Sequence, residues 1–186
     1  MVGRNSVDGV NAGPVLRYRL AETDDVGAVV DLVNSAYRGD VSRQGWTTEA
    51  DLLGGQRTDA REVEPQITDP GSVMLLCHQD DALVGCVHLQ RGEGRAYLGM
   101  LAVRPHLQGS GIGKCFLAEA ERFVRQEWGA SVLEMTVISS RAELIAYYQR
   151  RGYMLTDETR PFPREARFGL PKVDDLEFVV LRKRLD

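Results

Sequence analysis

Residues 101–114 read LAVRPHLQGSGIGK, an apolar segment that runs into a glycine-rich turn and then directly into a helical pattern. Gly109, Gly111 and Gly113 let the backbone approach a ligand closely and let successive N–H groups point the same way. The N-terminus of the following helix adds a partial positive charge and unpaired N–H donors. Lys114 supplies a full positive charge at the rim. The stretch therefore predicts an anion site, most naturally for a phosphate or pyrophosphate.

Two widespread phosphate-binding motifs fit this turn poorly. A P-loop has Gly five residues before the Gly-Lys pair and Ser or Thr after the Lys, and these positions are Gln108 and Cys115 here. The Rossmann fingerprint has a third glycine at the position that Lys114 occupies. The spacing that remains is Gln108-x-x-Gly111-x-Gly113.

This spacing resembles the Q/R-x-x-G-x-G/A motif of the GCN5-related N-acetyltransferases, whose loop holds the pyrophosphate of coenzyme A. Two further stretches resemble that family. The apolar tripeptide 101–103 precedes Arg104-Pro105, and Tyr148 stands four residues before Gly152-Tyr153, as in the family's Tyr-x-x-x-Gly-aromatic helix end. The expected order of elements also fits from about residue 16 to residue 185.

The resemblance implies acetyl-CoA as cosubstrate, transfer of its acetyl group to an amine, and a set of cofactor-binding positions. These positions are Leu101, Ala102, Val103, Gln108, Gly109, Ser110, Gly111, Ile112, Gly113, Lys114 and Arg141. Arg141 departs from the family, which often has Asn there; it could reach a phosphate or simply start a helix. No metal site is predicted.

The same resemblance implies a mechanism. Backbone N–H groups of Leu101 and Val103 would hold the acetyl group and its developing oxyanion. Tyr148 would protonate the leaving thiolate as a general acid, since the pKa of a phenol is close to that of a thiol. The alternative for Tyr148 is a core aromatic at helical spacing. Tyr147 is expected to be a packing residue.

The general base is the point at which the sequence departs most from the family. Many members have a Glu where this chain has Thr136, and residues 97–100 contain no carboxylate. Glu134, on the same strand face, His88 on a neighbouring strand and Glu49 in the variable region are the candidates, and each has an ordinary structural reading. A chain of water molecules with no single base is an equally good alternative.

The polar and aromatic region 37–59 is expected to shape the acceptor pocket. The residues predicted to bind the acceptor are Tyr37, Trp46, Thr48 and Arg57. Trp46 could instead cover a hydrophobic edge, and Thr48 could cap a short helix over residues 48–53. The loop 159–163, stiffened by two prolines, is expected to form a second wall.

Hydrophobic periodicity predicts a mixed α/β fold, a largely antiparallel twisted sheet flanked by helices. The expected strands are 15–20, 72–78, 82–90, 97–103, 131–138, 153–157 and 176–185. The expected helices follow Thr23–Asp25 up to about Gly39 and cover 111–128 and 141–151, with C-caps at Gly129 and Gly152.

Length and composition set the outer limits. The 186 residues predict one domain over 15–186 behind a flexible lead-in, residues 1–14. A net charge of -4 argues against a nucleic-acid partner, although it leaves room for a small basic pocket. No apolar run suggests a membrane span or a secretory signal, and three cysteines without C-x-x-C spacing predict reduced thiols and a cytoplasmic location.

Three functions remain open. The leading one is an acetyl-CoA-dependent N-acetyltransferase that acts on a primary amine of a small molecule or peptide. The alternatives are a non-catalytic acyl-CoA sensor of the same fold and an unrelated nucleotide-phosphate binder. A homodimer formed through the terminal strand 176–185 is also possible.

Overall fold

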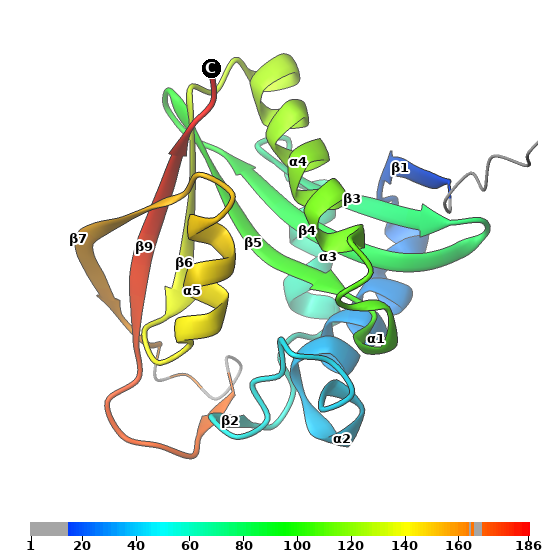
Figure 1. Ribbon diagram of the computed structural model, residues 1–186. Coiled ribbons are helices and arrows are strands. Elements are labelled where there is room, and N and C mark those ends of the chain that lie inside the picture. Colours follow the sequence, from blue (N-terminus) through cyan, green and yellow to red (C-terminus); the bar gives the residue numbers. More distant parts are fainter. Residues whose placement is uncertain (1–14, 164, 166–168) are drawn as a thin grey trace, which may run out of the picture.

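A seven-stranded sheet forms the centre of the computed structural model, which describes residues 15–163, 165 and 169–186 (Figure 1). The lead-in expected at residues 1–14 lies outside the described residues. In spatial order the strands are β1 (Leu16–Leu20), β3 (Ser72–Gln79), β4 (Ala82–Arg91), β5 (Arg95–Val103), β6 (Val132–Ile138), β9 (Glu177–Arg184) and β7 (Met154–Pro161). A second small sheet pairs β2 (Leu53–Gly54) with β8 (Leu170–Pro171).

Helices cover both faces of the large sheet. They are α1 (Val26–Tyr37), which follows the 3-10 turn η1 (Thr23–Asp25), α2 (Gly39–Ser42), α3 (Ala60–Thr68), α4 (Ile112–Trp128), which follows the 3-10 turn η2 (Pro105–Leu107), and α5 (Ala142–Gln149). Figure 1 shows α4 and α5 in front of the sheet and α1 and α3 behind it. Two apolar cores correspond to these layers, one around Phe116 of α4 and one around Leu32 of α1. None of the described helices is long and apolar enough to cross a membrane.

The mixed, largely antiparallel sheet predicted from the sequence is confirmed, since β5 and β6 are the one parallel pair among the described strands. The helix expected near 111–128 is also confirmed, and Gly129 ends it in the left-handed conformation with φ 63°. Cys77 and Cys86 are both buried, but they belong to different cores, so they pack as small hydrophobic side chains on opposite faces.

The short helix predicted over residues 48–53 is wrong. The Thr48 hydroxyl accepts a hydrogen bond from the Ala50 N–H at 3.2 Å, a local turn that competes with a helical start. The helix of this region is instead α3, where the Asp59 carboxylate caps the N-terminus by accepting from the Glu62 N–H at 3.1 Å. The last hairpin is also longer than expected, because β7 extends to Pro161.

The centre of the sheet opens between its two parallel strands. Residues Arg95–Leu98 of β5 pair with residues Val132–Met135 of β6, and the pairing stops there although both strands continue further (Figure 1). On its other side β5 has a bulge against β4, because Ala102 pairs with Cys86 and Gly99 pairs with His88. Met100 lies in this bulge with φ 48°. Beyond Leu98, β5 therefore has no pairing with β6, and between Gly99 and Ala102 it is also out of regular register with β4.

Candidate active site

Two cavities meet at the opening between β5 and β6. One, the glycine-turn cavity, has a volume of about 520 Å³ and lies between the start of α4 and helix α5. The other, the α3-side cavity, has a volume of about 350 Å³ and reaches from the opened strands toward α3. Four residues line both cavities and form their common wall: Tyr37, Leu101, Leu144 and Tyr148. The two cavities are therefore neighbours that share one wall.

The turn before α4 has the backbone that its glycines predict. Gly109 has φ 85° and Gly111 has φ 94°, a region that side-chain-bearing residues rarely adopt. Gly111 is the N-cap of α4, and its carbonyl accepts from the N–H groups of Lys114 and Cys115 at 3.0 and 3.1 Å, so the N–H groups of Ile112 and Gly113 have no acceptor within the helix. A Cβ on Gly113 would lie 3.2 Å from the Tyr147 hydroxyl, so this glycine permits a close contact between α4 and α5. All three glycines line the glycine-turn cavity.

The glycine-turn cavity carries an excess of positive charge. Lys114, Arg150 and Arg151 line it together with a single carboxylate among the described residues, that of Glu143. The Arg151 guanidinium lies 3.3 Å from the centre of the Tyr147 ring and donates to the Tyr147 carbonyl at 2.7 Å. The two arginines were not among the residues predicted from the sequence, although they lie inside the Tyr148–Gly152 motif. Tyr147, expected to pack, does pack, and it also lines this cavity.

The remaining cofactor positions divide into those that line the glycine-turn cavity and those that do not. Leu101, Val103, Gln108 and Lys114 line it together with the three glycines. Ala102 and Ile112 place their side chains in the two cores instead. The Ser110 hydroxyl donates to the Leu107 carbonyl at 2.6 Å.

The side chain of Gln108 has a structural contact that the sequence did not predict. Its Oε1 accepts from the N–H groups of Trp46 and Thr47, at 2.9 and 3.2 Å, and its Nε2 donates to the Val103 carbonyl at 3.0 Å. A Cβ on Gly45 would lie 2.5 Å from Gln108 Oε1, so a side chain at this position would displace the end of Gln108. This clamp places Trp46 over the glycine-turn cavity. Trp46, predicted to bind the acceptor, therefore lines the glycine-turn cavity and not the α3-side cavity.

Two tyrosines stand in the common wall. Tyr148 is 6% exposed and packs edge-on against Tyr147 and Tyr153, with ring centres 5.3 and 5.7 Å apart. Burial, followed by the neighbouring Tyr37, raises the pKa of Tyr148 well above its ordinary value, so its phenol stays protonated. The Tyr37 hydroxyl donates to the Leu101 carbonyl at 2.6 Å, and burial raises its pKa to about 12. Tyr37 thus holds the backbone at the bulge of β5.

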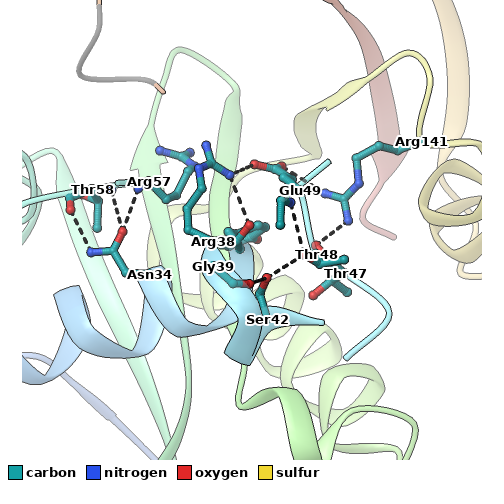
Figure 2. A network of polar contacts seen from close by, with 12 residues as sticks. Asn34, Arg38, Gly39, Ser42, Thr47, Thr48, Glu49, Arg57, Thr58 and Arg141 are labelled. Carbon is teal, nitrogen blue, oxygen red and sulfur yellow. Dashed lines mark hydrogen bonds and ion pairs between the residues drawn. The ribbon is translucent and has the colours of Figure 1, made fainter. Parts of the chain in front are cut away.

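The α3-side cavity contains a buried ion-pair network (Figure 2). Glu49 accepts from Arg38 Nη1 at 2.5 Å and from Arg141 Nη1 at 3.0 Å, and the three side chains are at most 10% exposed. Arg141 also donates to the Thr47 carbonyl at 2.6 Å. Two expectations need correction. Arg141 points into this network rather than toward the glycine turn, and both carboxylate oxygens of Glu49 are engaged by guanidinium groups, so Glu49 does not present a free base.

Glu134 lies outside both cavities. Its carboxylate accepts from Arg160 at 2.6 Å and from Arg182 at 2.8 Å. Burial raises the pKa of Glu134, but the hydrogen bonds from Arg182 and Arg160 outweigh that effect and the net pKa is lowered. A carboxylate that is paired in this way is a poor proton acceptor, so Glu134 does not fit the role of base. Thr48 is a further correction, since its hydroxyl bonds the Ser42 hydroxyl at 2.6 Å and it lines neither cavity.

His88 is the candidate base that the structure brings into the α3-side cavity with its ring available. Its Nε2 lies 2.7 Å from the Ser72 hydroxyl, which itself donates to the Gln66 carbonyl at 2.8 Å. Because the Ser72 proton is committed, the Ser72 oxygen accepts from Nε2–H and Nδ1 carries the lone pair. Burial lowers the pKa of His88 to about 4, so the imidazole is neutral at physiological pH.

The remaining predicted residues lie around the α3-side cavity. Arg57 lines it, and the side chain of Asn34 fixes the backbone there by accepting from the N–H groups of Arg57 and Thr58 (Figure 2). Phe162 and Pro163, from the loop predicted to form a second wall, also line it. Leu53, from the small second sheet, is a further lining residue.

Comparisons with a family model and with curated proteins both identify acetyltransferases. Residues 31–153 match the acetyltransferase (GNAT) family. Mycothiol acetyltransferase from Streptomyces avermitilis is 31% identical over 131 residues, which cover 68% of this chain and 39% of that protein. The protein of the same description from Streptomyces coelicolor is 30% identical, with 68% of this chain and 38% of that protein covered. The chain thus spans about two fifths of the length of these curated relatives.

Solved structures have the same fold at low identity. An N-acetyltransferase from Staphylococcus aureus Mu50 has a TM-score of 0.70 at 10% identity, with 92% of this chain and 98% of that chain covered. The ribosomal-protein-S18-alanine N-acetyltransferase from Escherichia coli has a TM-score of 0.68 at 15% identity, with 92% and 95% covered. A putative acetyltransferase from Salmonella typhimurium, solved with acetyl-CoA, has a TM-score of 0.64 at 18% identity, with 92% and 94% covered.

Proposed function

Since the chain belongs to the GNAT acetyltransferase family, we propose that it transfers the acetyl group of acetyl-CoA directly to a primary amine of a small molecule or peptide. The observation that carries this proposal is the common wall of the two cavities, in which Leu101 and Tyr148 face both sides. Acetyl-CoA would occupy the glycine-turn cavity and the amine would occupy the α3-side cavity. The cytoplasmic location and the homodimer stay predictions.

The glycine-turn cavity has the chemistry that acetyl-CoA requires. The first-turn N–H groups of α4, its helix dipole and Lys114 suit a pyrophosphate. Arg150 and Arg151 add positive charge for the remaining phosphate of the coenzyme. The thioester end would then reach the bulge of β5, where Leu101 lies.

The proposed reaction is a single transfer. A neutral amine attacks the thioester carbon, the N–C bond forms, and the C–S bond breaks with its electron pair on sulfur. The backbone N–H groups at Leu101 and Val103 would stabilise the intermediate oxyanion, because β5 has no pairing with β6 beyond Leu98. Tyr148 would give its proton to the leaving thiolate; its raised pKa keeps the phenol protonated at rest and makes it a weak acid, so the proton would move only as negative charge develops on sulfur.

The amine must lose one proton before it attacks and another after the bond forms. We assign their uptake to His88 Nδ1 and the water that leads from it, because His88 is a neutral imidazole within the α3-side cavity. Its low pKa makes it a relay to solvent rather than a strong base. The name of the Streptomyces relatives does not identify the acceptor here, because the matched region is only part of those proteins.

Release of CoA thiol from acetyl-CoA with a panel of primary amines tests this function. We expect turnover with at least one amine class. Tyr148→Phe should lower kcat by roughly 10²–10³-fold and change the KM for acetyl-CoA less than about threefold, because only the proton donor is removed. Tyr18→Phe is the matched control, since Tyr18 stacks on Phe116 and lines neither cavity of the site.

Two results would contradict the proposal. If acetyl-CoA raises the unfolding temperature but no amine in a broad panel releases CoA thiol, the chain is a sensor of acyl-CoA. If ATP stabilises the fold and acetyl-CoA does not, the glycine turn serves a different nucleotide. Wild-type kcat in Tyr148→Phe would remove Tyr148 from the mechanism while leaving the transfer itself intact.

A further inference from the structure

The end of the α3-side cavity nearest α3 contains polar atoms without partners. Arg57 and Gln66 line this cavity, and the buried atoms Arg57 Nη1 and Gln66 Oε1 have no hydrogen-bond partner in the described part of the chain. Glu62 contributes the third side chain, with Oε1 3.9 Å from Arg57 Nη1. We name Arg57, Glu62 and Gln66 the α3 subsite. Unpartnered buried polar atoms are unfavourable, and two at one end of a cavity indicate a ligand that satisfies them.

The position of Arg57 is fixed by its surroundings. Asn34 Oδ1 accepts from the Arg57 N–H at 2.7 Å, and Asn34 Nδ2 donates to the Thr58 carbonyl at 3.0 Å (Figure 2). The guanidinium also lies 5.9 Å from the centre of the Tyr37 ring. Arg57 is therefore held at the cavity by contacts that leave Nη1 for a ligand.

The charges around the cavity select the sign of that ligand. Among its described lining residues, three guanidinium groups stand against two carboxylates. Glu49 is shared by Arg38 and Arg141, and Glu62 also accepts from the Thr58 hydroxyl at 2.8 Å. His88 adds no charge at neutral pH. The excess of one positive charge disfavours an acceptor that is only a cation and favours one that brings its own anion.

We propose that the acceptor amine carries a carboxylate and that this carboxylate binds Arg57 in the α3 subsite, with Gln66 receiving a neighbouring polar group. This inference rests on the proposed acetyl transfer and specifies its substrate class. A carboxylate matches the single excess charge, whereas a phosphate dianion would exceed it. The chain as a whole has a net charge of -4, whereas the charged side chains that line the α3-side cavity leave one positive charge in excess.

A chain-length series tests the proposal. The probes are ω-amino acids, from glycine to 6-aminohexanoate, together with α-amino acids, and each is compared with the alkylamine of the same length that lacks the carboxylate. We expect kcat/KM for the best amino acid to exceed that of its alkylamine by 10–100-fold. Arg57→Gln should reduce this preference to within about threefold, and Arg57→Lys should restore part of it. Arg61→Gln, on the exposed face of α3, should keep the full preference.

The outcomes separate this inference from the proposed function. Equal or better turnover of alkylamines, of diamines or of aminoalkyl phosphates would overturn the carboxylate assignment while the transfer stands. A carboxylate preference that survives Arg57→Gln in a folded protein would overturn the role of Arg57. If no amine is acetylated, the proposed function fails, and calorimetric titration of the same amino acids then decides the subsite: binding that Arg57→Gln abolishes supports it, and no binding overturns it.

Discussion

At the scale of single residues, the contacts of Glu49 indicate a structural role. Its carboxylate joins two arginines. Arg38 lies at the end of α1, and Arg141 lies before α5, 92 positions from Glu49 in the chain. Removal of one partner from a buried ion pair leaves the other charge without compensation. Glu49 therefore connects the two sides of the α3-side cavity rather than exchanging protons with a substrate.

We expect Glu49→Gln to lower the free energy of unfolding by about 3 kcal/mol, because the buried guanidinium groups of Arg38 and Arg141 then lose the charge of the Glu49 carboxylate. Urea titration followed by circular dichroism measures the change. Glu134→Gln is the comparison: its arginine partners are at least 31% exposed, so the loss should be about 1 kcal/mol and kcat should not change. Wild-type stability with a large loss of kcat in Glu49→Gln would return the role of base to Glu49.

Sequence reasoning at this scale succeeds where a role depends on near neighbours. Gly111 and Tyr148 are recognised by spacings of a few residues, and both line the site as expected. Gln108, Glu49 and Arg141 have partners 61 or more positions away, and nothing in the local pattern indicates those contacts. Their residue types were predicted to be functional, and their actual contacts became visible only in the folded chain.

At the scale of elements, helix α4 begins and ends at glycines with positive φ. Gly111 has φ 94° at the N-terminus and Gly129 has φ 63° at the C-terminus, and a Cβ would meet no atom within 4 Å at either position. The two glycines thus carry similar backbone strain if substituted, yet only the first lines the glycine-turn cavity. Substitutions at these two glycines therefore distinguish an effect on helix stability from an effect on ligand binding.

Gly111→Ala and Gly129→Ala should each lower the free energy of unfolding by about 1–2 kcal/mol, since alanine is disfavoured at positive φ. Only Gly111→Ala should raise the KM for acetyl-CoA, by tenfold or more, because a changed turn misdirects the N–H groups of α4. Thermal unfolding and CoA-release kinetics provide the two readouts. An equal KM in both variants would argue against a phosphate site at this turn.

Elements were predictable to different degrees for a physical reason. Helix α4 buries a regular stripe that includes Ile112, Phe116, Ala120 and Val124, and that period is readable in the sequence. Helix α3 buries only Val63 and contains Pro65, so it lacks the regular buried apolar stripe that marks a helix. The Asp59 cap and packing against α1 and β3 stabilise it instead.

At the scale of the whole molecule, His88 links stability to pH. The pKa of its imidazole is lowered by burial to about 4, below the ordinary value of 6.5, so the unfolded chain binds the proton more tightly. Stability is therefore complete above pH 6.5 and decreases as the pH falls toward 4. Asp25 acts in the same direction at lower pH. The hydrogen bond from Arg19 is the largest cause that lowers the pKa of its carboxyl to about 2, so the stability that Asp25 contributes is lost below about pH 4.

Between pH 7.5 and pH 4.5 we expect His88 to reduce the free energy of unfolding by roughly 2–3 kcal/mol. Urea titrations at the two pH values measure this loss. His88→Gln keeps a donor toward Ser72 but cannot be protonated, so the loss should shrink to that of the remaining groups. An unchanged pH dependence in that variant would mean that His88 takes up its proton in the folded chain as readily as in the unfolded chain.

The short pairing of β5 with β6 has a mechanical consequence. The strands β1, β3, β4 and β5 form one half of the sheet, and β6, β9 and β7 form the other; the ladder from Arg95 to Leu98 is the seam that joins them. Beyond the seam the halves are held by side chains such as the Glu49–Arg141 pair. A cosubstrate lying in the opening would touch both halves and stiffen the hinge between them. Acetyl-CoA in the glycine-turn cavity would then reduce the motion of the walls of the α3-side cavity, so the acceptor would bind to a more rigid pocket.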